Sequence, residues 1–270
     1  MAGFPLGITT RTMAIQADVI AALVLREIKT RFGHTGIGWI WLLFEPLAQG
    51  LVYVALYEFI RSRASPLRGV DVAEFMLSGI IPWLFYMRTC SQVENAVDSN
   101  RALLVYPQVT PLDIALARTI LEALIMYIVV FFFLATQWFL TGNLEIGNLL
   151  NLLTACACLS VMGFGVGLTL MSLDHFIPGL LLVAPYINRL LYFTSGVFFT
   201  LETVPANYRS YVDWNPLLQS IEWARQSYFS NVPGDLLNLN LLAYAVPGLA
   251  ALGILLERAT RHLSKRVSTS

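Results

Sequence analysis

Several charged side chains in this 270-residue sequence lie inside long apolar segments, where an ionisable group is costly and is usually paired or functional. Glu45 falls roughly eight residues into one such segment, and Arg88 roughly six residues from the end of the next, at about 1.5 Å per helical residue. Both therefore sit at similar depth, as do Arg118 and Glu122 in the third segment. We predict that Glu45 and Arg88 face each other or a shared polar cavity. The alternative is an ion pair with a purely structural role.

Arg189 lies about twelve residues into a later apolar segment, hence near its middle at about 1.5 Å per residue. No acidic residue is expected at that depth in this chain. An unpaired guanidinium there needs water or an anion. We hypothesise that Arg189 lines a conduit and attracts an acidic polymer. The alternative is a contact with a backbone carbonyl or with a partner chain.

Aromatic residues recur along the same segment as Arg189. They are Tyr186, Tyr192, Phe193, Phe198 and Phe199. Sugar rings present apolar C–H faces that pack on aromatic rings, so these side chains could form a slide for successive sugars. The alternative is that they face lipid or neighbouring helices.

Other chemistry finds little support in the sequence. A phosphate-binding loop requires Gly-x-x-x-x-Gly-Lys-Ser/Thr, which does not occur. The glycine-rich run 163–167 lies inside a charge-free segment, where close helix packing explains it better. No nucleophile and base share a predicted face, and the formal net charge of zero argues against nucleic-acid binding. We expect neither an enzyme nor a metal site, and any energy source must be another chain or an ion gradient.

The composition indicates the elements that hold these residues. The chain is 57% hydrophobic and 13% charged, whereas a soluble domain carries about 25% charged residues. Six segments approach or exceed the roughly 20 apolar residues that cross a bilayer. They are 37–60, 72–93, 112–140, 149–173, 177–201 and 236–256. We therefore predict an all-α integral membrane protein with six transmembrane helices.

Basic residues indicate the orientation, because cytoplasmic flanks carry an excess of Lys and Arg. Those that precede the first segment or follow the last are Arg11, Arg26, Lys29, Arg31, Arg258, Arg261, Lys265 and Arg266. Both termini are therefore predicted to be cytoplasmic. One loop disagrees, since Arg61, Arg63 and Arg68 fall on the outer side.

The residues before the first segment predict an amphipathic helix. Its apolar stripe repeats every fourth residue, at Ile20, Val24, Ile28 and Phe32. Arg26 and Lys29 fall on the opposite side, and Arg31 follows them. Such a helix would lie along a membrane surface with its basic face toward anionic headgroups.

Two further segments are too polar to span. Residues 202–235 combine many aromatic and charged side chains, which favours two short half-inserted helices broken at Asn215–Pro216. The alternative is an aromatic belt at the outer interface. Between the second and third spans, Asp98 or Ser99 can cap a short helix that Pro107 would end. The alternative there is a plain connector.

The order and spacing of these features resemble the permease subunits of type-2 ATP-binding-cassette (ABC-2) exporters. The resemblance rests on the amphipathic segment 26–32 with Gly38, Trp41 and Pro46, on Gly79-Ile80-Ile81-Pro82, and on Trp214-Asn215-Pro216-Leu217. Within that family the sequence looks most like the capsular-polysaccharide export permeases of Gram-negative bacteria. Lipid-linked, acidic capsular polysaccharide is then the expected cargo. Alternative cargoes within the same architecture are O-antigen, a teichoic-acid-like polymer or a drug. A different class of protein is a further alternative: an ion-coupled carrier, or a membrane enzyme acting on lipid-linked sugar.

The resemblance implies a division of labour along the chain. Residues 1–36 would be a cytoplasmic interface or gate helix, carrying Arg26, Lys29 and Arg31, and residues 37–270 a six-span domain with a re-entrant segment near 202–235. A coupling helix near 96–107 would dock on the ATPase. Its candidate contact residues are Asp98, Ser99, Asn100, Arg101, Leu103, Leu104 and Tyr106.

The resemblance also implies partners. The permease would pair with a second copy of itself and with two ATP-binding-cassette ATPase subunits, which bind the ATP and Mg that this chain does not. A periplasmic adaptor and an outer-membrane export protein would carry the polymer onward from the bacterial inner membrane.

Overall fold

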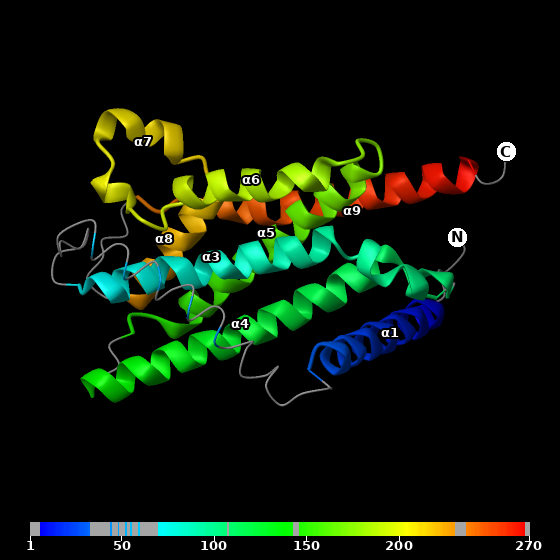
Figure 1. The fold of residues 1–270 in the computed structure, drawn as a ribbon, viewed down its shortest axis with the longest axis horizontal. Coiled ribbons are helices and arrows are strands. Elements are labelled where there is room, and N and C mark those ends of the chain that lie inside the picture. Colours follow the sequence, from blue (N-terminus) through cyan, green and yellow to red (C-terminus); the bar gives the residue numbers. More distant parts are fainter. Residues whose placement is uncertain are drawn as a thin grey trace.

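The computed structural model describes residues 6–32, 70–106, 108–142, 146–229 and 236–267, together with the separate positions 44, 48, 52, 55 and 59. Apart from an isolated bridge between Ile146 and Phe229, the regular structure in these residues is helical. The helices, labelled as in Figure 1, are α1 (Leu6–Phe32), α3 (Val72–Glu94), η1 (Asp98–Val105), α4 (Pro111–Thr141), α5 (Leu149–Asp174), α6 (Leu180–Thr194), η2 (Leu201–Thr203), α7 (Ala206–Val212), α8 (Pro216–Tyr228) and α9 (Leu239–Val267).

Local sequence explains where the long helices begin and end. Thr110 and Asp113 form a capping box at the start of α4, with Pro111 in the first helical position. Gly142, with φ 71°, ends α4 in the left-handed conformation that glycine adopts without strain. Asn148 begins α5 by accepting a hydrogen bond from a backbone N–H of the first turn.

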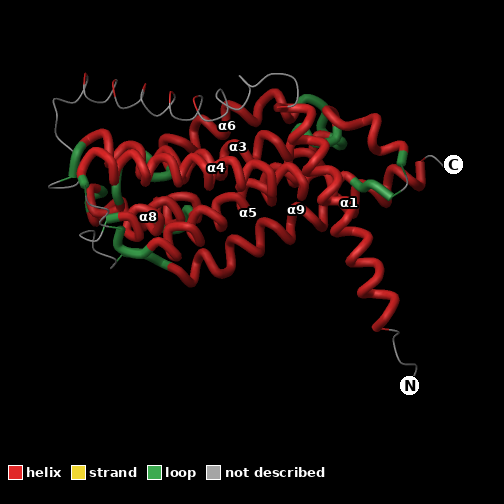
Figure 2. Tube along the Cα trace, turned by 90° about the horizontal axis from the view of Figure 1, so that it is seen from below, coloured by secondary structure: helices red, strands yellow, loops and turns green. Residues whose placement is uncertain are grey.

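The helices form a bundle around α5, which packs against α3, α4, α6, α8 and α9. Helix α1 packs along α4, and Figure 2 shows its N-terminal part extending away from the other helices. In Figure 1, η1, the α5–α6 turn and the C-terminal part of α9 gather at one end of the bundle, whereas α7 and α8 lie at the other. The two ends of the bundle are therefore built from different elements.

Glycine lets α5 approach its neighbours closely. A Cβ added at Gly163 would lie 2.5 Å from the Tyr86 carbonyl oxygen of α3. One added at Gly165 would lie 2.6 Å from the Leu249 carbonyl group of α9. A side chain at either position would force the helices apart, so the interpretation of residues 163–167 as a packing run is confirmed.

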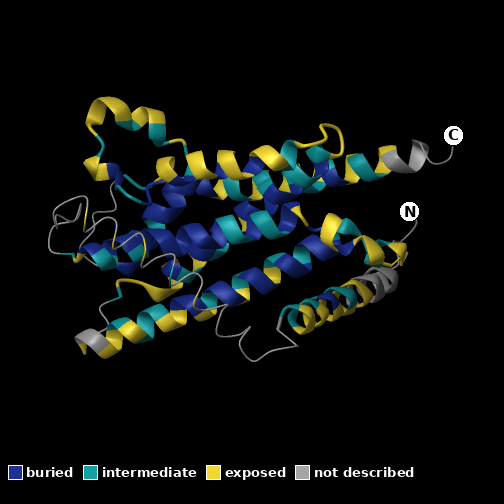
Figure 3. Ribbon diagram, in the orientation of Figure 1, coloured by how far each residue is buried: buried dark blue, intermediate teal, exposed yellow. Residues whose placement is uncertain are grey.

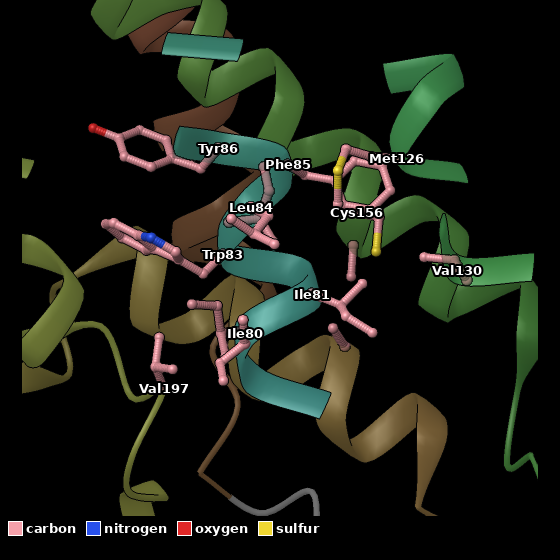
Figure 4. Packing of buried hydrophobic residues seen from close by; sticks show 14 of the residues in the cluster. Ile80, Ile81, Trp83, Leu84, Phe85, Tyr86, Met126, Val130, Cys156 and Val197 are labelled. Carbon is pink, nitrogen blue, oxygen red and sulfur yellow. The ribbon is translucent and has the colours of Figure 1, made fainter. Parts of the chain in front are cut away.

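The apolar core lies between α3, α4, α5 and the α6–α8 region (Figure 3). Figure 4 shows part of it, with α3 contributing Ile80, Ile81, Trp83, Leu84, Phe85 and Tyr86. Large apolar side chains also remain exposed on the outer faces of the bundle, among them Phe131, Leu182, Leu190 and Leu255. Exposed apolar surface of this extent suits contact with lipid or with a partner.

Among the described residues, three helical stretches are long and apolar enough to cross a membrane: Pro111–Phe139, Leu149–Asp174 and Leu239–Leu263. They coincide with three expected spans, 112–140, 149–173 and 236–256. Helix α3 covers the expected span 72–93. The span expected at 37–60, with Glu45 inside it, lies outside the described residues apart from the separate positions named above.

The helix within the span expected at residues 177–201 is shorter than predicted. Helix α6 covers only Leu180–Thr194, which at 15 residues is shorter than the roughly 20 needed to span a bilayer. Gly179 with φ 95° precedes it, and Gly196 with φ 74° follows it. Left-handed backbone at both ends interrupts the helix although the segment is apolar throughout.

Residues 202–235 contain the expected break. Helix α7 ends at Val212 and α8 begins at Pro216, with the Asn215 side chain accepting a hydrogen bond from the Leu217 backbone N–H at 3.0 Å. Helix α7 is largely exposed, whereas α8 is buried against α3, α5 and α9. This segment thus contributes a structural element to the core rather than only a surface loop.

Candidate functional site

Arg189 opens onto a cavity of about 260 Å³ between α3 and α6. The cavity is lined by Trp83, Met87, Pro185, Asn188, Arg189, Tyr192 and Phe193. The Arg189 side chain is exposed, and it makes no hydrogen bond or ion pair with the described part of the chain. A solvent-facing guanidinium beside an aromatic wall can bind an anionic group.

Asn188 provides a second polar group in this cavity. It is only 2% exposed, and its Oδ1 accepts a hydrogen bond from the Tyr86 hydroxyl at 3.2 Å. Among the described residues its Nδ2 has no oxygen or nitrogen acceptor, and its neighbour is the Cys90 thiol, a weak acceptor. A buried donor without a strong acceptor is costly, so a ligand oxygen or a water molecule would stabilise it.

Three of the predicted aromatic residues, Tyr192, Phe193 and Phe198, form one connected group with Trp83. The ring centroids of Trp83 and Tyr192 are 5.3 Å apart, and those of Tyr192 and Phe198 are 5.0 Å apart. Phe193 stacks on Phe198 with centroids 5.7 Å apart and an interplanar angle of 24°. Tyr186 is 69% exposed and lies outside the cavity lining. The structure therefore brings Arg189, Tyr192, Phe193 and Phe198 together, with Tyr186 apart from them.

Arg88 belongs to a charged cluster that joins α1, α3 and α4. Its Nε lies 3.1 Å from Oε2 of Glu122, which also pairs with Arg31. Glu27 accepts from Arg31 at 2.9 Å and lies 3.4 Å from Nε of Arg118. Glu122 is fully buried, and the charges of Arg31 and Arg88 compensate its carboxylate. The predicted pairing of Glu45 with Arg88 stays a prediction, since Glu45 lies outside the described residues.

The basic residues of the expected interface helix differ in their surroundings. Arg26 Nη1 donates to Asn100 Oδ1 at 3.0 Å and so connects α1 to η1. Arg31 also donates to Gln92 Oε1 at 2.6 Å, and it points into the bundle rather than away from it. Lys29 is exposed. Only part of this basic set is therefore available to a membrane surface.

The segment expected to be a coupling helix is a short 3₁₀-helix, η1, with a kink at Asn100. The expected cap is wrong, because Val97 occupies the cap position without a side-chain bond. The Asp98 carboxylate instead pairs with Arg101 Nη2 at 2.9 Å.

The candidate contact residues of η1 and the adjoining turn divide into two faces. Those on the outer face are exposed: Asp98, Ser99, Arg101 and Tyr106. Those on the inner face are Asn100, Leu103 and Leu104, of which the leucines pack against a cluster from α1, α3, α4 and α5. The outer face is the part that a partner could contact.

Sequence reasoning missed a buried pair in α8. Arg225 is fully buried, and its Nη1 lies 3.4 Å from Oε2 of Glu222, which is 2% exposed. The i, i+3 spacing of a Glu and an Arg in an aromatic segment was the available signal. It was missed because the segment was expected to be a half-inserted hairpin rather than part of the core.

A bundle with several membrane-length helices and an arginine-bearing aromatic cavity defines a multi-pass integral membrane protein. The chain belongs to the ABC-2 type transporter family, whose model matches residues 18–229.

Three relatives illustrate the sequence similarity to known proteins. The chain is 32% identical over 229 residues to the polysialic acid transport protein KpsM of Escherichia coli, covering 85% of this chain and 88% of that protein. It is 29% identical over 224 residues to the capsule polysaccharide export inner-membrane protein CtrC of Neisseria meningitidis, covering 82% of each. It is 26% identical over 248 residues to the capsule polysaccharide export inner-membrane protein BexB of Haemophilus influenzae, covering 92% of this chain and 93% of that protein.

Proposed function

We propose that this chain is the permease subunit of an ATP-driven exporter that moves lipid-linked, acidic capsular polysaccharide across the bacterial inner membrane. The observation that carries the proposal is similarity over most of the chain to relatives named as polysialic acid or capsule polysaccharide transport proteins. The sequence contains no phosphate-binding loop. ATP and Mg would therefore be bound by a separate ATPase, and this chain would need no cofactor of its own.

The assembly we infer is a homodimer with two ATPase subunits on the cytoplasmic side. In this arrangement the chain has six spans, the fifth formed by the short helix α6 together with its flanking residues. Both termini lie in the cytoplasm, α1 serves as the interface helix, and η1 serves as the coupling helix. Helices α7 and α8 form the re-entrant segment at the opposite, periplasmic end. A periplasmic adaptor and an outer-membrane export protein would receive the polymer.

The cavity beside Arg189 is the proposed contact with the polymer. The guanidinium attracts carboxylate or phosphate groups, the Asn188 Nδ2 can donate to a sugar oxygen, and the Tyr192–Phe193–Phe198 group offers apolar ring faces. Such a surface binds each sugar weakly, which suits movement of a chain through a conduit. Glu45 and Arg88 remain candidates for the inner part of the same path.

The test is export of labelled acidic polysaccharide in vesicles that contain the permease and its ATPase. We expect Arg189→Leu to abolish export while assembly with the ATPase persists, and Arg189→Lys to retain part of the activity because it keeps the charge. Leu190→Ala, at the exposed neighbouring position, is the matched control.

Different outcomes overturn different parts of the proposal. Unchanged export by Arg189→Leu would remove the conduit assignment. Export of O-antigen, a teichoic-acid-like polymer or a drug in place of acidic polysaccharide would change the cargo. Transport without any ATPase would favour an ion-coupled carrier and would overturn the proposal as a whole.

A further inference from the structure

A second, larger cavity of about 460 Å³ lies at the end of the bundle opposite α7. It is enclosed by η1, the C-terminal end of α3, the start of α4, the α5–α6 turn and the C-terminal part of α9. Its charged and titratable lining residues are Glu94, Asp98, Arg101, Asp174, His175, Glu257 and Arg261. Four carboxylates thus share the cavity with two arginines and one histidine, so carboxylates outnumber the other charged or titratable side chains.

Two of the four carboxylates already have partners. Asp98 pairs with Arg101 at 2.9 Å on the surface of η1. The Asp174 Oδ1 accepts hydrogen bonds from the backbone N–H groups of Gly179 and Leu181, both at 3.2 Å, and so closes the α5–α6 turn. These two acids have structural roles.

The other two carboxylates are buried and poorly compensated. Glu94 is 6% exposed and makes no hydrogen bond or ion pair with the described residues. Glu257 is 3% exposed, neither of its oxygens accepts a hydrogen bond from a described residue, and Arg261 Nε stands 3.7 Å from its Oε1. A buried carboxylate is unstable unless it is paired or protonated.

We propose that this cavity receives a lysine or arginine side chain of the ATPase subunit, which pairs with Glu94 and Glu257. The inference rests on the proposed function, because it needs an ATPase at this end of the permease. The ATPase would then contact two features of the permease: η1, the proposed coupling helix, and the acidic cavity beside it.

The structure favours a protein side chain over other cations. Exposed residues of η1 and of the α5–α6 turn, namely Asp98, Arg101 and His175, rim the cavity, so it opens beside the polar η1 rather than onto the apolar helix faces. No group of three His, Cys, Asp or Glu side chains is arranged to hold a metal ion within the described ranges. The volume accommodates a long side chain together with its stem.

The experiment measures the affinity of the ATPase for the permease held in lipid nanodiscs. We expect Glu94→Gln and Glu257→Gln each to raise Kd by about tenfold or more, because each leaves a partner cation buried without its full compensation. Glu202→Gln, which changes an exposed carboxylate on η2 at the other end, should leave Kd unchanged. Glu94→Lys should abolish binding, and a Lys→Glu or Arg→Glu change in the ATPase should restore it.

Each outcome separates this inference from the proposed function. An unchanged Kd for both Gln variants, with wild-type binding intact, would overturn the proposal that the cavity binds an ATPase side chain. It would leave the transporter assignment standing. A wild-type permease that binds no ATPase would overturn both. K⁺ or phosphatidylethanolamine could instead raise the melting temperature of the wild type but not of the variants, with Kd for the ATPase unaltered. That result would assign the cavity to a small cation or a lipid amine and would also overturn the proposal. Melting temperatures of the isolated variants show whether they fold.

Discussion

Arg225 illustrates how protein groups stabilise a buried guanidinium. Nη1 donates to the carbonyl oxygen of Gly196 at 3.0 Å, Nη2 donates to that of Val197 at 3.1 Å, and the guanidinium lies 4.4 Å from the centroid of the Phe75 ring. With Glu222 beside it, the group joins α8 to α3 and to the chain after α6. A lysine could not make these several directed bonds at once.

We predict that Arg225→Met lowers the free energy of unfolding by about 3–5 kcal/mol, because it leaves the buried Glu222 carboxylate without its partner. Thermal unfolding of the purified permease in detergent measures the effect. The double variant Arg225→Met with Glu222→Leu should recover part of the loss. A melting temperature of Arg225→Met equal to that of the wild type would contradict this account.

Glu94, at the end of α3 just beyond the apolar span 72–93, is expected to make stability depend on pH. Burial raises the pKa of this carboxyl from 4.5 to about 7. The folded state therefore favours the protonated form, so the stability from this group is fully present below about pH 4.5 and is lost as the pH rises through about 7. We expect the isolated permease to melt lower at pH 8 than at pH 5. The difference should shrink in Glu94→Gln, and an equal difference in both proteins would argue against this role.

Helix α1 is attached to the bundle by both ion pairs and apolar packing. Apolar residues of α1 between Val19 and Ile28 pack against α4. Glu27 and Arg31 join the cluster around Glu122 and Arg118. The ion pairs therefore act together with apolar packing in holding α1 against α4.

Glu122→Gln is predicted to weaken the attachment of α1 by about 1.5–3 kcal/mol, since Arg31 and Arg88 both lose a charged acceptor. Hydrogen exchange should then accelerate in residues 19–32, while the amides of α5 keep their protection. Glu202→Gln serves as the control, because its side chain is exposed on η2. If exchange in α1 did not change, apolar packing alone would hold the helix.

Across the whole molecule, the two ends of the bundle differ in a way that suits a transporter. One end carries η1 and the acidic cavity, and the other carries α7 and the buried α8 (Figure 1). The arginine-bearing cavity on α6 lies along the bundle between them. The proposed docking of an ATPase at only one end requires such a difference between the two ends.

The proposed orientation predicts opposite labelling at the two ends. In a chain whose native cysteines are replaced by alanine, a membrane-impermeant maleimide should react with Tyr208→Cys in intact cells. It should react with Ser99→Cys only after the inner membrane is permeabilised. Both positions are exposed, on α7 and η1 respectively. The reverse pattern would invert the orientation, and labelling of both from outside would reject the six-span arrangement.

Much of the architecture could be predicted from local signals. Apolar length located α3, α4, α5 and α9, the Thr110 and Asn148 caps mark two helix starts, and the glycines of α5 indicated close packing. Arg189 could be recognised as unusual because it is a charged residue inside an otherwise apolar segment. These features depend on neighbours in the chain.

Packing between helices decided the rest. Arg88 pairs with Glu122, and Arg225 bonds to the backbone carbonyls of Gly196 and Val197, neither of which follows from one segment alone. The reason is geometric: hydrophobic period and caps define a helix, but the partner of a buried charge depends on the rotation and register of a second helix. Glu94 and Glu257 are 163 positions apart in the chain, and only the folded bundle brings them to one cavity.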